Sequence, residues 1–350
     1  MTMSEQFNRA AMATIALSTV AAIWTGATVA AEPKLERFRY SEAHMGVPWE
    51  IVLYAADGES ANSAAAAAYR RIAEINSALS DYQDDSEVNR LNATAGQGMA
   101  VAVGNDLWAA LSTAQELSAK SDGAFDVTAG PMVRLWRRAR RQKEFPRAEL
   151  LAATKEVVGY QLVKLDPAKK TVELTRTGMR LDFGGIGMGY AADEAIKVFK
   201  ARGITRVMID ASGDIVCGDA PPDKPGWVVG IAPADGGKGK PTRYLSLTHA
   251  AVTTSGDAYQ FVEFDGVRYS HIIDPATGLG LTTRCAVTIV AADCITADSV
   301  ATAVSVMGPE RGAAYVELDP RLAAFFECLV DGMPRITETS RLKGFVVHSQ

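Results

Sequence analysis

The order of the predicted secondary structure is the feature that most constrains the fold of this chain. Helix-forming segments dominate up to residue 141. From residue 161 onward β-branched and aromatic segments dominate, apart from a helix that ends at Gly203 and another that includes residues 296–302. A parallel sheet built from βαβ units requires regular alternation of strands and helices. We therefore expect a mixed α/β domain of the α+β type, with no internal repeat and no long linker.

The expected helices begin with an alanine-rich segment at 60–79, in which Ile72, Ile75 and Leu79 recur at helical spacing. Further helices are expected at 86–92, 106–120 and 128–141. Strands are expected at 161–165, 171–174, 206–210, 227–231, 244–247, 259–264, 267–272 and 286–291. The dipeptide Asp265-Gly266 between two of these strands predicts a hairpin turn.

Composition and charge limit the classes of partner. The 350 residues are 48% hydrophobic, which is enough for a substantial core, and the net charge is −5. A general nucleic-acid binder needs a basic face, so nucleic acid is not expected as a partner. The basic run from Arg134 to Lys143 is a local exception. It is either a solvated helix face or a docking patch for an acidic partner or a phosphate.

The first 31 residues resemble a secretory signal. Arg9 precedes an apolar stretch from Ala10 to Val29, and small residues follow as far as Ala31. This pattern predicts cleavage after Ala30 or Ala31, which leaves residues 32–350 as one domain. The apolar stretch is also long enough for a retained membrane anchor, which is the alternative. The chain is therefore expected to be exported to the periplasm or cell envelope.

The four cysteines do not form a recognisable metal motif. They are spread too widely for a CxxC site or a compact disulfide framework. An exported chain can pair such residues, yet each one stands in an apolar or strand-like context that suits a small buried side chain. The residues are Cys217, Cys285, Cys294 and Cys328.

A glycine-rich loop at 181–193 has two interpretations. Gly187, Gly189 and Ala192 match the GxGxxA fingerprint of a dinucleotide-binding fold, and Asp210 follows 18 residues after Ala192. Such a loop normally follows a long buried strand, whereas the segment before this loop, residues 177–183, is short and contains charged residues. We therefore favour the other interpretation, in which the glycines simply let the backbone approach a ligand.

Two further segments carry side chains suited to chemistry. The segment 269–278 combines His271, Asp274 and a hydroxyl group with a turn-forming Pro/Gly pair. At 296–302, Asp298 and Thr302 are four residues apart on an expected helix, so their oxygen atoms point the same way. Together these residues indicate an acid/base group beside a site for a hard cation.

The spaced motifs together resemble the ApbE family of FAD:protein FMN transferases. The resemblance extends from about Met45 to Val347. Its pieces are Met45-Gly46, 80–82 with 85–87 and 91–92, 123–128, 182–193, 212–214, 254–256, 270–278, and 297–298 with Thr302.

This resemblance implies a magnesium-dependent, exported enzyme that splits FAD and attaches FMN to a threonine or serine hydroxyl of a target protein. It implies Asp298, Thr302 and the backbone carbonyl of Gly185 as magnesium ligands. The implied flavin dinucleotide contacts are Met45, Tyr82, Ala124, Phe125, Asp126, Asp182 and Met188. Two positions depart from the family pattern: Met188, where a lysine or glutamate is common, and Ala301, where a further carboxylate occurs.

The roles of several of these residues have plainer alternatives. Tyr82 and Phe125 can be core aromatics, and Asp126 and Asp182 can cap helices or turns. For the transfer reaction His271 is the expected base, because a hydroxyl group needs one to attack at neutral pH. We expect Asp274 to orient it.

Two alternatives to transfer remain from the sequence, namely an FAD pyrophosphatase and a non-catalytic periplasmic flavin-binding protein. The expected acceptor is a subunit of a membrane redox complex.

Overall fold

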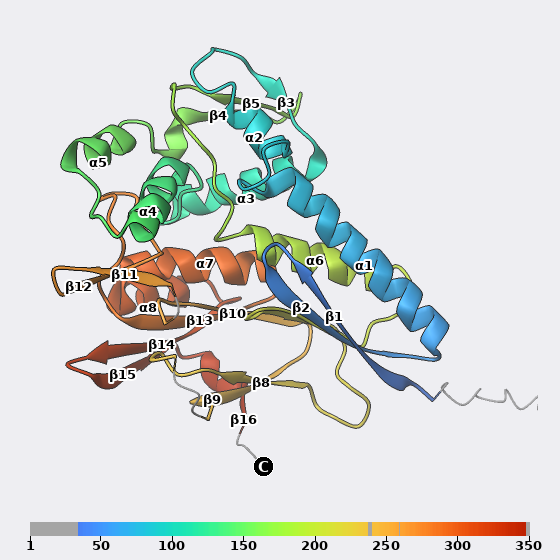
Figure 1. Ribbon diagram of the computed structural model, residues 1–350. Helices are drawn as coiled ribbons and strands as arrows, with labels where there is room; N and C mark the ends of the chain where they lie inside the picture. Colours follow the sequence, from blue (N-terminus) through green and yellow to red (C-terminus); the bar gives the residue numbers. More distant parts are fainter. Residues whose placement is uncertain (1–33, 237–239, 259, 348–350) are drawn as a thin grey trace, which may run out of the picture. The chain divides into compact units, whose positions relative to one another are not determined.

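An eight-stranded antiparallel sheet forms the centre of the structure, a computed structural model that describes residues 34–236, 240–258 and 260–347 (Figure 1). The strand order is β1-β2-β6-β7-β10-β13-β14-β15. The strands are β1 (Glu36–His44), β2 (Val47–Ala55), β6 (Val207–Ala211), β7 (Asp214–Cys217), β10 (Ala250–Ser255), β13 (Cys285–Ala291), β14 (Ala323–Val330) and β15 (Met333–Glu338). Neighbouring strands run antiparallel throughout, so this sheet needs no βαβ crossovers.

Helices cover one face of this sheet. α6 (Gly187–Lys200) packs between α1 (Gly58–Leu79) and α7 (Cys294–Met307). α7 in turn lies on β10 and β13, and α8 (Pro309–Leu318) lies beside α7 and β14. The alanine-rich face of α1 is fully buried, which allows these helices to approach closely. The main core therefore lies between the sheet and the helices.

A small three-stranded sheet, in the order β16-β9-β8, covers the opposite face. Its strands are β8 (Trp227–Ile231), β9 (Arg243–Leu247) and β16 (Val346–Val347), and the turn η2 (Leu342–Gly344) precedes the last of them. Successive residues along a strand of the large sheet point to opposite faces. Ile51 and Leu53 of β2 enter the helix-side core, whereas Val52 between them enters the second core. This is the period of two expected of a strand buried on both faces.

The remaining elements lie on the side of the helix layer that is away from the large sheet (Figure 1). They are α2 (Glu87–Asn92), α3 (Asn105–Lys120), α4 (Gly130–Gln142), α5 (Ala148–Lys155), η1 (Tyr160–Leu162) and the sheet β3 (Val101–Ala102), β5 (Thr171–Leu174) and β4 (Val163–Asp166). The hairpin of β11 (Phe261–Phe264) and β12 (Val267–Ser270) packs against α4. There Trp136 contacts Tyr269 and donates a 2.8 Å hydrogen bond to the Gly278 carbonyl.

The mixed α/β fold predicted from the sequence is confirmed. The two-residue hairpin turn is also confirmed, with φ of 50° at Asp265 and 76° at Gly266. The elements that the sequence did not predict are the strands β1, β2, β3, β7, β10, β14, β15 and β16 and the helices α5 and α8. The dinucleotide-fold interpretation is wrong, because β6 pairs antiparallel with both neighbours and Arg180 before the loop forms only an isolated bridge, to Ala129.

A disulfide joins two adjacent strands. Cys285 of β13 and Cys328 of β14 are bonded, while Cys217 and Cys294 are buried thiols. The predicted burial is confirmed for Cys217, Cys294 and Cys328, whereas Cys285 is half-buried, and the sequence left the pairing open. The expected signal at 1–31 lies outside the described residues, and all the elements named above belong to the unit that begins at Leu35. Within the described residues, no helix has the length and apolar character needed to cross a membrane.

Candidate functional site

The glycine-rich segment that leads into α6 packs closely against α7. A Cβ atom on Gly189 would lie 2.4 Å from the carbonyl oxygen of Cys294 and 2.9 Å from Cβ of Asp298. Only glycine permits this approach. As a result, the Gly189 N–H donates a 3.1 Å hydrogen bond to Oδ2 of Asp298. The close packing fixes the carboxylate of Asp298 beside the loop.

The same packing brings the residues expected to hold the metal close to one segment. A Cβ atom on Gly185 would lie 2.8 Å from Oγ1 of Thr302 and 3.4 Å from the ring of Phe125. Asp298 and Thr302 are one turn apart on α7, which begins at Cys294 with Asp293 as its N-cap. The pair therefore lies inside the helix and not at its start, but it presents a carboxylate and a hydroxyl to one loop.

The charge at Asp298 is poorly compensated. The residue is 5% exposed, and within the described ranges its carboxylate has no ion pair. Burial raises the pKa of Asp298 well above its ordinary value, and the nearby charges of Asp214 and Asp193 raise it further against the opposing Gly189 N–H. A bound cation would offset this cost. Carboxylate, hydroxyl and peptide carbonyl oxygens are the donors that Mg²⁺ prefers, so the residues present fit that ion.

The described residues contain no cluster of three or more His, Cys, Asp or Glu side chains arranged as a metal site. Ala301, where the resemblance implied a further carboxylate, is fully buried in the packed face of α7.

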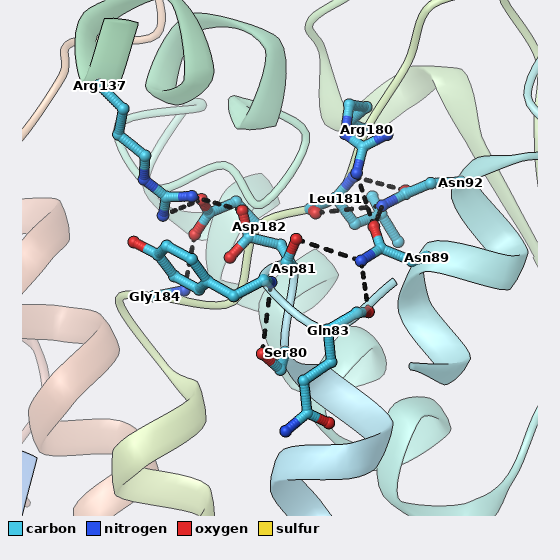
Figure 2. A network of polar contacts seen from close by, with 11 residues as sticks. Ser80, Asp81, Gln83, Asn89, Asn92, Arg137, Arg180, Leu181, Asp182 and Gly184 are labelled. Carbon is cyan, nitrogen blue, oxygen red and sulfur yellow. Dashed lines mark hydrogen bonds and ion pairs between the residues drawn. The ribbon is translucent and has the colours of Figure 1, made fainter. Parts of the chain in front are cut away.

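A second group of residues surrounds Arg137 of α4 (Figure 2). Its guanidinium donates to Oδ2 of Asp81 at 2.5 Å and to Oδ2 of Asp182 at 2.9 Å. It also lies over the ring of Tyr82, 4.4 Å from the centroid. Tyr82 is 75% exposed, which excludes a core role, whereas Phe125 is only 4% exposed and belongs to the core. The exposed ring of Tyr82 is available for stacking with a planar ligand.

Asp182 is an acid held between a cation and a loop amide. Burial raises the pKa of Asp182, and the charge of Asp81 raises it further. The charge and hydrogen bond of Arg137 and the Gly184 N–H, which donates at 2.8 Å, act in the opposite direction. Burial lowers the pKa of Arg137, but the two carboxylates outweigh that effect and raise it overall. The network therefore ties α4 to the loop that leads to Gly185.

A cavity of about 450 Å³ adjoins this network, and arginines contribute much of its wall. Three of them are Arg134, Arg141 and Arg180. Arg180 donates a 2.6 Å hydrogen bond to the amide oxygen of Asn89, and the amide nitrogen of Asn89 donates to the carbonyls of Asp81 and Gln83 (Figure 2). Polar contacts thus hold this wall in a fixed arrangement.

The other expected flavin contacts are distributed around these two groups. Met45, in a left-handed conformation with φ of 52°, lies against Gly187 of α6, and Met188 is half-buried at the second position of that helix. Ala124 precedes Phe125 in the turn after α3. Both carboxylate oxygens of Asp126 are engaged by protein groups, since Oδ1 accepts from Thr128 and Oδ2 from the Tyr160 N–H. Asp126 therefore holds a turn, as the plainer alternative expected.

His271 lies after β12 beside α4. A small cavity of about 60 Å³ here is lined by His271, Gln260 and Arg140, and also by Arg137. Nδ1 of His271 makes a 3.1 Å hydrogen bond with the Gln260 carbonyl, so Nδ1 is the donor and Nε2 carries the lone pair. Packing lowers the pKa of His271, the Arg140 charge lowers it further, and the Gln260 carbonyl opposes both.

The expected orienting contact from Asp274 is wrong. Oδ1 of Asp274 accepts a 2.9 Å hydrogen bond from the Ala276 N–H inside its own turn, and the Gln260 carbonyl takes the place on the His271 ring. The Asp-Pro-Ala-Thr-Gly sequence itself favours this turn, because a short carboxylate bonds the backbone two residues on.

The sequence analysis did not select Arg137 as a site residue. Its only signal was the spacing of Arg134, Arg137 and Arg141, which places these residues on one side of a helix.

Comparisons with known proteins bear on the family and the function of this chain. The sequence profile of the ApbE family matches residues 45–326. A FAD:protein FMN transferase of Treponema pallidum is 35% identical over 71% of this chain and 72% of its own length. A Vibrio cholerae protein of the same name is 31% identical over 71% and 74%.

Solved structures of flavin transferases are also similar. The flavin transferase ApbE of Vibrio cholerae has a TM-score of 0.79 at 28% identity, covering 89% of this chain and all of that one. The apo form of the Pseudomonas stutzeri flavinyl transferase ApbE gives the same TM-score and identity, covering 89% of this chain and 96% of that one.

Proposed function

The chain belongs to the ApbE family, and we propose that its residues transfer FMN from FAD to a hydroxyl group of an acceptor protein with the help of Mg²⁺. The transferase function is that of the curated relatives, which match this chain over most of their length. The observation that carries the proposed metal dependence is the junction of α6 and α7. There the Asp298 carboxylate accepts from the Gly189 N–H, and Thr302 lies close to Gly185, which supports a metal held between α7 and the glycine-rich segment.

Mg²⁺ would be held by the Asp298 carboxylate, the Thr302 hydroxyl and the Gly185 carbonyl. When bound, it supplies positive charge that stabilises phosphate oxygens and a departing AMP. The buried and poorly compensated carboxylate of Asp298 supports this assignment. FAD itself would contact Tyr82, Phe125 and Asp182, with Met45, Ala124 and Met188 contributing apolar surface.

His271 would act as the base. Because its Nδ1 donates to the Gln260 carbonyl, Nε2 can accept the proton of the acceptor hydroxyl. The hydroxyl oxygen forms a bond to the FMN-side phosphorus, the bond from that phosphorus to AMP breaks, and AMP leaves with the electron pair. Packing keeps His271 neutral by lowering its pKa, which suits a base at neutral pH.

The acceptor would be a threonine- or serine-bearing exported protein, expected to belong to a membrane redox complex. Export of the enzyme is supported by the signal-like residues 1–31 and by the Cys285–Cys328 disulfide, since disulfides persist in oxidising compartments.

The test is mass spectrometry of a candidate acceptor peptide incubated with the protein, FAD and Mg²⁺ while AMP is followed in parallel. We expect a covalent gain equal to FMN, matched by AMP and lost when EDTA replaces Mg²⁺. AMP without peptide modification would instead support FAD hydrolysis. The absence of both products would support a flavin-binding protein without turnover.

A further inference from the structure

The basic side of α4 is not used by the proposed chemistry. We define the arginine face as Arg134, Arg137, Arg140 and Arg141 of α4 together with Arg180. Arg137 lines both the 450 Å³ cavity and the small cavity beside His271. The face therefore continues from the Tyr82 side of the site to the proposed base.

Most of the charge on the arginine face is uncompensated. Arg137 is paired with Asp81 and Asp182. Of the other four, Arg140 contacts only the amide oxygen of Gln260, at 3.4 Å, and Arg180 contacts the neutral Asn89. Within residues 34–236, 240–258 and 260–347, none of these four arginines forms an ion pair. A chain with a net charge of −5 thus carries a local surplus of positive charge at this place.

The arginines also act on one another. Burial lowers the pKa of Arg180, and the like charge of Arg134 lowers it further, although Asp81 and Asp182 oppose this. Arg134 and Arg180 line the same cavity, and two guanidinium groups that face one space favour an anion between them. Arg134, Arg140 and Arg141 are exposed, so a partner can reach them without rearrangement of the fold.

We infer that the arginine face binds a carboxylate-bearing segment of the acceptor protein. This rests on the proposed function, in which the acceptor hydroxyl must reach Nε2 of His271. The polypeptide on either side of that hydroxyl then lies over the adjoining surface, where Arg137 and Arg140 border the small cavity. Aspartate or glutamate side chains near the modified residue fit this surface, because the guanidinium fork binds carboxylates in a bidentate manner.

The test uses two fluorescein-labelled peptides with one central threonine, flanked by three glutamates on each side or by three glutamines. Binding is measured by fluorescence anisotropy with FAD present. The double variant Arg134→Glu/Arg141→Glu reverses two free charges of the face. Arg138→Glu is the matched control, since Arg138 is exposed on the same helix, bonds only to Gln142 and lines neither cavity.

We expect the glutamate peptide to bind the unmodified protein and to lose roughly 10-fold or more in affinity in the double variant, with little change in Arg138→Glu. Binding should also weaken as salt is raised. Equal binding of the two peptides, or an equal loss in Arg138→Glu, would overturn the inference. So would loss of FAD binding in the double variant, which would assign these arginines to the nucleotide. FMN attachment and AMP release test the transferase separately, so the two proposals can fail independently.

Discussion

The junction of α6 and α7 and the arginine face of α4 carry opposite charges in opposite environments. At the junction of α6 and α7 the Asp298 carboxylate is buried against the glycine-rich segment, and no basic side chain of the described residues forms an ion pair with it. On α4 several guanidinium groups are exposed with too few carboxylates around them. A buried, closely packed acid suits a small ion held in fixed geometry, whereas exposed arginines suit a partner that arrives and leaves. The comparison separates the proposed metal site from the surface proposed to receive the acceptor, which lies beside His271.

The largest effect should come from the buried part. Replacing Asp298 with alanine removes the only charged ligand of the proposed metal site, so Mg²⁺-dependent AMP release should fall below detection. The fold should survive, because the variant no longer buries a carboxylate at a raised pKa. AMP release and the thermal midpoint are the two measurements. Normal Mg²⁺-dependent turnover in this variant would remove Asp298 from the metal site.

Replacing His271 with alanine tests the proposed base, which lies beside the arginine face. Transfer should slow by roughly 10² to 10⁴ because the acceptor hydroxyl loses its proton acceptor. FAD binding, measured by flavin fluorescence, should be unchanged, because the ring of His271 bonds the Gln260 carbonyl and not the Tyr82 group. If transfer persists at the original rate, another group takes the proton.

A third change separates packing from chemistry. In Gly189→Ala the new methyl group would lie 2.4 Å from the Cys294 carbonyl, so α6 and α7 must move apart. We expect a loss of about 1–3 kcal/mol in the free energy of unfolding, measured in urea. Gly344→Ala is the control, since nothing lies within 4 Å of its added methyl group. Equal stability of the two variants would show that the junction is not tightly packed.

The smallest effect is a change in pH dependence. The pKa of His271 lies below its ordinary value near 6.5, so the neutral base forms as pH rises through a value below 6.5, and transfer should rise with it. Arg140→Gln removes one cause of that lowering, so the acid limb of the profile should move to higher pH. Rates at saturating acceptor across about pH 5 to 8 would measure this. If the acid limb of the profile stays at the same pH in Arg140→Gln, that limb does not reflect the titration of His271.

The sequence predicted the features that depend on local order. The Asp265-Gly266 turn, the short helix at 86–92 and the spacing of Asp298 and Thr302 follow from neighbouring residues alone. Features that depend on distant residues were missed or wrong. Arg137 donates to carboxylates 56 and 45 positions away in the sequence. The ring of His271 forms its hydrogen bond with the backbone carbonyl of Gln260, which lies just before β11.

The missed strands have a related explanation. β1 is exposed at most positions and lacks a clear alternation of polar and apolar residues, while β14 is buried at almost every position. Neither shows the period-two pattern that identifies a half-buried strand. Their place at and near the edges of an antiparallel sheet is set by pairing and is not encoded in a local signal.

The Cys285–Cys328 disulfide also makes a closed covalent ring, because β13 leads into α7 and β14 returns from α8. The ring contains both Asp298 and Thr302. A pulling force applied to the two ends of the chain would pass through the sulfur atoms and would not stretch the residues between them. The helix that carries the proposed metal ligands is thereby the segment of this enzyme most sheltered from mechanical extension.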